Sequence, residues 1–208
     1  MHRSHDALIV LDVQNDFCPG GALAVADGDA VVPLVNAMME DFGTVVLTQD
    51  WHPAAHTSFA ANHPGAAPFT LVTMPYGPQL LWPVHCVQGT AGAAFHADLR
   101  TNPVQMVIRK GFRPGIDSYS AFFENDHKTP TGLEGYLRSR GVSAVTLAGL
   151  ATDFCVAWTA LDARKAGFKA SVIEDACRGI DLNGSLGAAW ANMKKAGVKR
   201  IQSSDIAA

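Results

Sequence analysis

Three residues of this 208-residue sequence have side chains that could together activate a nucleophile: Asp12, Lys110 and Cys155. Each follows a short apolar run of the kind that forms a buried strand. A carboxylate can take the proton of a thiol, and an ammonium group beside both can stabilise developing negative charge. The set therefore predicts a cysteine hydrolase in which the thiol attacks the carbon of an amide.

Each of the three residues also has an ordinary structural explanation when it is taken alone. A cysteine is often buried and inert, an aspartate at a strand end often caps a turn, and a lysine is usually exposed. The position of Cys155 favours the functional interpretation. Thr152 is a candidate N-cap, so Cys155 falls in the first helical turn. There the helix dipole is expected to lower the pKa of the thiol, and main-chain amides can hold an oxyanion.

A second set of residues has the composition of a metal site. Asp50 and His52 are two residues apart, so on an extended backbone their side chains point the same way, and His85 is the best third ligand. One carboxylate and two imidazoles, with further positions open, suit a first-row divalent cation. Whether His56 is also a ligand stays open. The other histidines of this region are interpreted as surface polar residues: His63 and His96.

The candidate residues need a scaffold that brings distant parts of the chain together. Short apolar or β-branched runs predict six strands, at residues 7–11, 44–48, 104–109, 144–148, 169–173 and 198–202. Helical spacing predicts four helices, at residues 29–42, 131–140, 152–166 and 183–196. This alternation predicts an α/β fold, a single domain over residues 1–208 with three αβα layers and a doubly wound, mostly parallel six-stranded sheet. Ligands bind beyond the carboxyl ends of such strands, where the candidate residues lie.

Regular periodicity is missing from about residue 50 to residue 102, a segment rich in proline, glycine, histidine and tryptophan. So long a segment without regular elements inside a domain is usually functional, unless it contains elements that the pattern does not reveal. We therefore predict an irregular insertion that binds metal and substrate.

Composition argues against several other classes of function. The 16 basic and 19 acidic residues give a net charge of −3, so the chain lacks the basic excess of a nucleic-acid-binding protein. No apolar run approaches the roughly 20 residues of a membrane span, and no secretory cleavage site follows the first residues. Four scattered cysteines without a C-x-x-C pair are typical of free thiols in a cytoplasmic protein. The expected partner is a small-molecule substrate, and a monomer and a homo-oligomer are both compatible with the sequence.

Several motifs, in the same order, resemble the nicotinamidases, also called pyrazinamidases, which belong to the isochorismatase-like cysteine hydrolases. The resemblance runs from about Leu8 to Arg200, nearly the whole chain. The motifs that carry it are residues 12–21, 50–53, 82–86, 109–111 and 149–156. It implies Asp12, Lys110 and Cys155 as a catalytic triad. It also implies a cis peptide bond between Leu150 and Ala151, with the main-chain amides of Ala151 and Cys155 as the oxyanion hole.

The same resemblance implies a metal and a pocket for an aromatic ring. It implies one divalent cation, zinc in the first place with iron or manganese as alternatives, held by Asp50, His52 and His85. The residues that it implies for substrate binding are Phe17, Trp82, Tyr119 and Gln14.

The function that follows from the resemblance is hydrolysis of nicotinamide, and of pyrazinamide, to the acid and ammonia through a cysteine thioester, as a step of NAD salvage. Two alternatives stay open. A sibling hydrolase of the superfamily would act on another small amide, but such relatives generally lack the metal segment. A non-catalytic metal- or ligand-binding module on the same scaffold would not need a thiol beside a carboxylate and a lysine.

Overall fold

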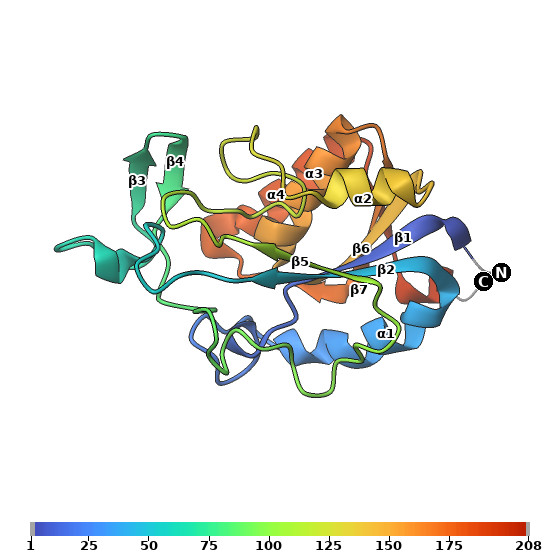
Figure 1. The fold of residues 1–208 in the computed structure, drawn as a ribbon, viewed down its shortest axis with the longest axis horizontal. Coiled ribbons are helices and arrows are strands. Elements are labelled where there is room, and N and C mark those ends of the chain that lie inside the picture. The colour runs from blue at the N-terminus through green and yellow to red at the C-terminus, as the bar shows by residue number, and fades with distance from the viewer. Residues whose placement is uncertain (1–2, 207–208) are drawn as a thin grey trace.

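The computed structural model describes residues 3–206, and a six-stranded sheet forms its centre (Figure 1). The strands lie in the order β5-β2-β1-β6-β7-β8, and each neighbouring pair is parallel. The predicted α/β fold with a doubly wound sheet of six strands is therefore confirmed. Residues 1, 2, 207 and 208 of the single domain that we predict lie outside the described residues.

The elements follow the predicted alternation closely. The strands of the main sheet are β1 (Arg3–Leu11), β2 (Phe42–Asp50), β5 (Met106–Lys110), β6 (Ala144–Leu150), β7 (Lys169–Arg178) and β8 (Lys199–Ile201). The α-helices are α1 (Val31–Met38), α2 (Leu133–Ser139), α3 (Ala157–Lys165) and α4 (Ser185–Lys195). A π-helical segment, η5 (Thr152–Val156), directly precedes α3. The 3-10 helices are η1 (Asn15–Phe17), η2 (Gly28–Ala30), η3 (Met39–Asp41), η4 (Ala60–Asn62), η6 (Leu182–Gly184) and η7 (Ser203–Asp205).

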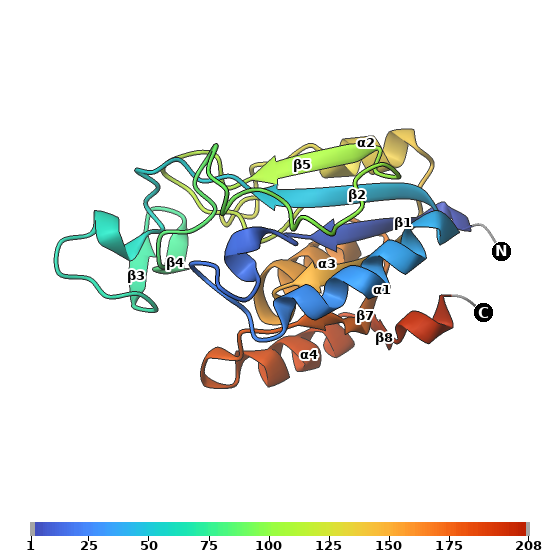
Figure 2. The same ribbon diagram turned by 90° about the horizontal axis from the view of Figure 1, so that it is seen from below.

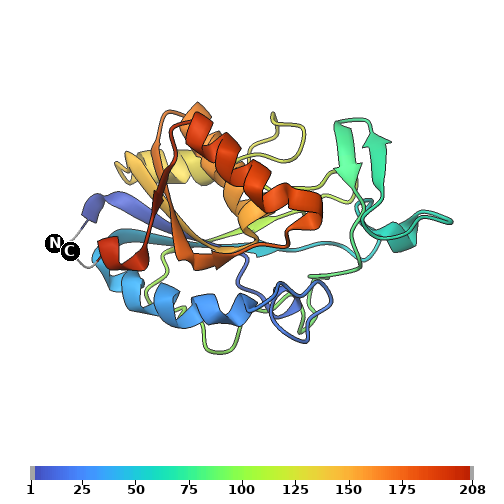
Figure 3. The same cartoon turned by 180° about the vertical axis from the view of Figure 1, so that it is seen from behind.

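Helices cover both faces of the sheet, as the three-layer prediction requires. The helix α1 lies on one face, and α2, α3 and α4 lie on the other (Figure 1, Figure 3). Successive side chains of a strand point to opposite faces, so β1 contributes Leu8 and Val10 to the core beneath α1 and Ile9 to the core beneath the other helices. Burial on both faces explains why residues 7–11 of β1 form a continuous apolar run. No helix within residues 3–206 is long and apolar enough to cross a membrane.

The strand order places a topological switch point between β1 and β6. From β1 the chain adds β2 and β5 on one side and then returns to add β6, β7 and β8 on the other side. The carboxyl ends of β5, β2 and β1 point toward the end of the molecule that carries β3 and β4 (Figure 2). Asp12 directly follows β1, and Cys155 lies in η5 just beyond β6. Both residues therefore stand where a doubly wound sheet binds its ligand.

The segment between residues 50 and 102 contains regular structure that we did not predict. The strands β3 (Leu71–Met74) and β4 (Gly77–Leu80) form an antiparallel hairpin, separate from the main sheet. It stands beyond the carboxyl ends of the main strands, away from the start of β1 (Figure 1). Each strand has four residues, and one of the eight is buried, so neither strand produces a hydrophobic pattern long enough to recognise.

Candidate active site

The structure brings Asp12, Lys110 and Cys155 together in the interior of the protein. The Lys110 ammonium lies 2.8 Å from Asp12 Oδ2 and 3.4 Å from Cys155 Sγ. Sγ and a carboxylate oxygen of Asp12 are within 4.8 Å of each other. Asp12, Lys110 and Cys155 are 0%, 1% and 7% exposed, respectively, so bulk water does not screen the charges. The Asp12 carboxylate is thus placed to take the proton of the Cys155 thiol, with the Lys110 ammonium beside both groups.

Strand register and one glycine produce this arrangement. Asp50 and Lys110 are register partners on the parallel strands β2 and β5, and Lys110 donates a hydrogen bond to Asp50 Oδ1. Gly149 of β6 has a φ of +114°, and a Cβ there would lie 2.2 Å from the carbonyl oxygen of Leu11. A larger residue would push β6 away from the end of β1, so Gly149 keeps η5 close to Asp12.

The backbone at Asp12 is itself unusual. Its φ is +47°, in the left-handed region that non-glycine residues rarely occupy. Its main-chain amide donates to Thr48 Oγ1 at 3.1 Å, and the Thr48 hydroxyl donates to Asp12 Oδ1 at 2.5 Å. Strain of this kind persists where the surroundings hold a residue in a functional position. Because Oδ1 receives the threonine hydroxyl, Oδ2 is the oxygen left to exchange a proton.

Two buried carboxylates flank Lys110, and their pKa values move in opposite directions. Burial raises the pKa of Asp12 above its usual range, although the charge of Lys110 opposes the shift. Burial also acts on Asp50, but Lys110 and His52 lower the pKa of that carboxyl well below its usual range. Neighbouring titratable groups whose pKa values are driven apart mark an acid–base pair. Asp50 therefore stays ionised, whereas Asp12 is suited to receive and return a proton.

The expectation of a lowered thiol pKa at Cys155 is wrong. Burial raises the pKa of Cys155 well above its usual value, and the charges of Asp12 and Asp50 raise it further, while only Lys110 opposes the shift. The residue also lies in a π-helical segment whose N-cap is Ala151, not in an α-helical turn capped by Thr152. The thiol thus keeps its proton at neutral pH until a base takes it, which makes the neighbouring carboxylate essential.

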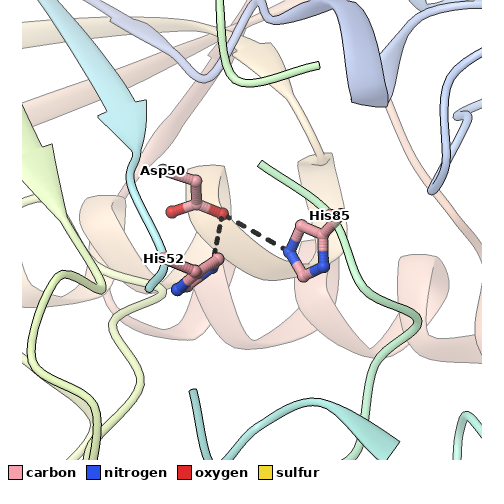
Figure 4. A group of neighbouring side chains, drawn as sticks. All are labelled: Asp50, His52 and His85. Atoms are coloured by element: carbon pink, nitrogen blue, oxygen red, sulfur yellow. Dashed lines mark ion pairs between the residues drawn. The ribbon is translucent and has the colours of Figure 1, made fainter. Parts of the chain in front are cut away.

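The residues that we predict as metal ligands also converge. His52 Nε2 lies 3.6 Å and His85 Nε2 lies 3.8 Å from the same oxygen, Asp50 Oδ2 (Figure 4). Two ligands that each lie about 2.1 Å from one ion are roughly 3–4 Å apart, so the spacing suits a shared cation. All three side chains are buried. Asp50 therefore faces Lys110 with one oxygen and the two imidazoles with the other.

Hydrogen bonds behind the rings fix which imidazole nitrogen faces Asp50. His52 Nδ1 lies 2.8 Å from the carbonyl oxygen of Gly111, and His85 Nδ1 lies 2.8 Å from that of Pro83. A carbonyl oxygen only accepts, so each Nδ1 carries the hydrogen and each neutral ring offers an Nε2 lone pair. A Cβ at Gly111 would lie 2.3 Å from the His52 ring, which explains the glycine. Two lone pairs and an anionic oxygen thus converge, and they fit a divalent cation.

Burial and charge act oppositely on the two imidazoles. Burial, together with the charge of His52, lowers the pKa of His85 to about 4. Burial also lowers the pKa of His52, but the adjacent Asp50 more than offsets it, so the pKa is raised. His85 is therefore neutral at physiological pH, the form that binds metal.

The histidines outside this group have other partners. His56, which the sequence leaves open, accepts a hydrogen bond at Nδ1 from the Ser58 amide and directs Nε2 toward the carbonyl oxygen of Ile116 at 3.1 Å. Both of its ring nitrogens are thus engaged away from Asp50 Oδ2. His63 Nε2 contacts the Thr57 carbonyl oxygen, and His96 Nδ1 accepts from the Asp98 amide.

A cavity of about 330 Å³ opens onto the thiol and the Asp50–His85 pair. Three of the predicted substrate-binding residues, Phe17, Trp82 and Tyr119, line it. The indole of Trp82 meets the Tyr119 ring nearly edge-on, with 6.0 Å between centroids. The walls are thus flat aromatic surfaces, and they suit a planar ring. The other side chains that line the cavity, which we did not predict, are Leu23, Asp117, Phe154 and Ile180.

Phe154 is the most informative of the residues that we did not predict. Its ring lies edge-on to Trp82, with 4.9 Å between the centroids. It directly precedes Cys155 in η5. Its position in the sequence, next to the candidate nucleophile, is the signal that could have identified it as a pocket residue.

Gln14 is a correction to the predicted pocket, because its side chain does not line this cavity. Its amide is fully buried and bonded to main chain instead: Oε1 accepts from the Asp50 amide at 2.8 Å, and Nε2 donates to the carbonyl oxygens of Asp50 and Ala93 at 2.9 Å. The physical reason is that Asp50 lies at the end of β2, where its main-chain groups need partners. Gln14 therefore holds the backbone of Asp50.

The peptide bond between Leu150 and Ala151 is cis, as the resemblance implies. Ala151 and Cys155 both line the cavity. Main-chain N–H groups at the start of a helical segment are the usual donors of an oxyanion hole.

A doubly wound αβα domain with a buried thiol, carboxylate and lysine at its switch point has the architecture of a cysteine hydrolase. The comparison with known sequences agrees, since the isochorismatase domain matches residues 6–205. The chain belongs to the isochorismatase family.

Similar proteins extend over the whole chain. A curated nicotinamidase from Acinetobacter baylyi is 58% identical over 200 residues, which cover 96% of this chain and 94% of that protein. A solved structure of a nicotinamidase/pyrazinamidase from Acinetobacter baumanii is 60% identical and superposes with a TM-score of 0.98, covering 99% of this chain and 100% of that one. The structure of PnC1 from L. infantum in complex with nicotinate is 42% identical, with a TM-score of 0.86, covering 98% and 96%.

Proposed function

We propose that this chain is a nicotinamidase, which hydrolyses nicotinamide to nicotinate and ammonia in NAD salvage, and that it also accepts pyrazinamide. The observation that carries the proposal is one cavity in which the Cys155 thiol faces aromatic walls at Phe17 and Trp82 and the Asp50–His85 pair. Flat walls hold a heteroaromatic ring, and the thiol lies where a carboxamide on that ring would reach it. The relatives named above, two nicotinamidases and a nicotinate complex, support the same substrate.

In the first half of the reaction, Asp12 takes the proton of the Cys155 thiol, and Sγ attacks the carboxamide carbon. The negative charge that develops on the carboxamide oxygen is stabilised by the main-chain N–H groups of Ala151 and Cys155. Asp12 then returns the proton to the nitrogen, the C–N bond breaks, and ammonia leaves a thioester on Cys155.

In the second half, a water molecule attacks the thioester carbon while Asp12 takes one of its protons. The C–S bond breaks, the carboxylic acid is released, and the thiolate of Cys155 leaves beside the ammonium of Lys110 at 3.4 Å. Asp12 then returns a proton to the thiol. Lys110 holds its charge throughout because Asp12 and Asp50, despite burial, raise the pKa of its ammonium group well above the usual value.

The residues that would hold a divalent cation are Asp50, His52 and His85, through one carboxylate oxygen and two Nε2 atoms. When bound, such a cation supplies a Lewis acid and a positive charge beside the substrate ring. Zinc is our first choice, since a pyrazinamidase of Pyrococcus horikoshii, 38% identical with a TM-score of 0.77, is known in complex with zinc. Iron and manganese suit the same oxygen and nitrogen donors.

Replacing His85 by alanine is expected to weaken zinc binding by about 100-fold or more, because one of three protein ligands is lost. The measurement is calorimetric titration of the chelator-treated protein with zinc, and then with iron and manganese. The intact protein should bind about one equivalent. The matched control is His96→Ala, which removes an imidazole from a partly exposed position outside the cavity. Equal zinc affinity in the His85 variant and the intact protein would reject this ligand set.

The function itself is tested by ammonia release from a panel of nicotinamide, pyrazinamide, isochorismate-type substrates and ureido compounds. We expect turnover of the two heteroaromatic amides and none of the others, because the aromatic walls select a planar ring. Turnover of a ureido compound alone would favour a sibling hydrolase, and turnover of nothing would favour a binding module. A cytoplasmic location and a monomeric or homo-oligomeric enzyme complete the proposal.

A further inference from the structure

A buried glutamine on the β3–β4 hairpin reaches the wall of the cavity without lining it. Gln79 of β4 is 1% exposed, although most of the hairpin around it is not buried. Its Nε2 donates to Asp117 Oδ2 and to the Tyr119 phenol oxygen, each at 2.9 Å, and to the carbonyl oxygen of Leu80 at 2.7 Å. Asp117 and Tyr119 both line the cavity, whereas Gln79 does not. One side-chain amide therefore ties the hairpin to two wall residues.

The orientation of this amide follows from a chain of hydrogen bonds. The main-chain N–H of Tyr119 can only donate, and it donates to Asn125 Oδ1 at 2.9 Å. The other end of the Asn125 amide is therefore its Nδ2, which donates to Gln79 Oε1 at 3.0 Å. Tyr76 also donates its hydroxyl to Oε1, at 3.2 Å. Gln79 must then turn Nε2 toward Asp117 and Tyr119, and a flipped amide would place two NH₂ groups face to face.

The phenol oxygen of Tyr119 connects the β3–β4 hairpin to the aromatic wall of the cavity through hydrogen bonds. It accepts from Gln79 and also from Trp82 Nε1 at 3.0 Å. The two donors approach from residues on different segments, so they fix where the Tyr119 ring and the indole lie relative to each other. A buried hydrogen-bond network of this kind specifies one geometry, and it loses that geometry when one member cannot pair.

We propose that Gln79 is a positioning residue for the substrate ring, which acts through Tyr119 to hold the aromatic wall in its binding geometry. The inference rests on the proposed function, because it assigns that wall to the ring of the amide substrate. Gln79 does not touch the thiol, Asp12 or Lys110, so its loss should weaken substrate binding far more than it slows the chemical step.

The test is Gln79→Met, which keeps the volume of the side chain and removes its hydrogen bonds. We expect KM to rise about tenfold and kcat to change by less than about threefold. The matched control is Gln105→Met. Gln105 also bonds main chain through its amide, to Val45 at 2.6 Å, but it is exposed and precedes β5, far from the cavity. KM and kcat of the control should stay unchanged.

A double-mutant cycle with Tyr119→Phe separates positioning from a general structural role. Without the phenol oxygen, Gln79 can no longer donate a hydrogen bond to residue 119. Gln79→Met should therefore change KM by less than about twofold in that background. An undiminished rise of KM there, or a fall of kcat with KM unchanged, would overturn the inference. If Gln79→Met does not fold, Asn125→Asp removes the donor that orients Gln79. It should raise KM in the same way.

The kinetics are measured with the amide of the panel that the unaltered enzyme hydrolyses fastest. Failure on nicotinamide then rejects the proposed function, while the comparison of KM values still decides the role of Gln79. If no amide is hydrolysed, the Kd for nicotinate, measured by calorimetry, takes the place of KM with the same expected changes.

Discussion

Ammonia release from nicotinamide is expected to fall by on the order of 10⁴-fold or more when Cys155 is replaced by alanine. The variant retains Asp12, Lys110 and the cavity, but no nucleophile remains to form the thioester. Single-turnover assays should show no covalent adduct by mass spectrometry, whereas the intact enzyme should show one that gains the mass of the acyl group.

Cys177→Ala is the matched control for this result. Cys177, in β7, is also a buried free thiol, and burial raises its pKa to about 12, but the cation that acts on it is the guanidinium of Arg178, and it lies outside the cavity. The control should keep its turnover. Substantial amidase activity in a purified, metal-loaded Cys155 variant would show that the thiol is not the nucleophile.

Replacing Asp12 by asparagine is expected to lower turnover by about 10³-fold or more near neutral pH. The substitution keeps the shape of the side chain and leaves the thiol without its base. Because burial holds the pKa of Cys155 above its usual value, only a small fraction of the thiol is ionised at neutral pH.

The residual activity of this variant should depend on pH in a specific direction. Below the pKa of the thiol, the thiolate fraction grows about tenfold for each unit of pH, so the residual rate should rise with that slope. The measurement is kcat/KM between pH 6 and about pH 9, alongside the intact enzyme. Asp6→Asn is the matched control, since Asp6 lies within β1, the strand that Asp12 follows, and also accepts from a threonine hydroxyl, that of Thr146. A pH-independent residual rate would contradict a role for Asp12 as the base.

The parts of the site that the sequence predicts are those that depend on strand ends. The side chains of Asp12, Lys110 and Asp50 each lie at or just beyond the end of a buried apolar run, and parallel strands bring such ends to one edge. Predicting that these three side chains lie together required only that the strands be parallel and adjacent. The strand order, which sets Asp50 and Lys110 in register, required the structure.

What the sequence could not reveal depends on contacts between distant segments. The lowered thiol pKa expected for Cys155 considered a helix end alone and omitted burial beside two carboxylates. Gln14 lies within the motif of residues 12–21, which led us to place it in the pocket, but its amide is hydrogen-bonded to the main chain of Asp50 and Ala93. The strand β4 is too short to carry a periodic signal, so Gln79 stayed unnoticed until the fold placed it beside Tyr119.

The two oxygens of Asp50 face different partners, and this has a thermodynamic consequence. One oxygen accepts from Lys110, which also contacts the Cys155 sulfur, and the other faces the pair of imidazoles. A single carboxylate therefore couples the free energies of two binding events. Linkage is reciprocal, so if cation binding alters the equilibrium affinity for a ligand that contacts the thiol, binding of that ligand alters the affinity for the cation by the same factor. Ligand binding at the thiol and metal retention in this protein are then not independent properties.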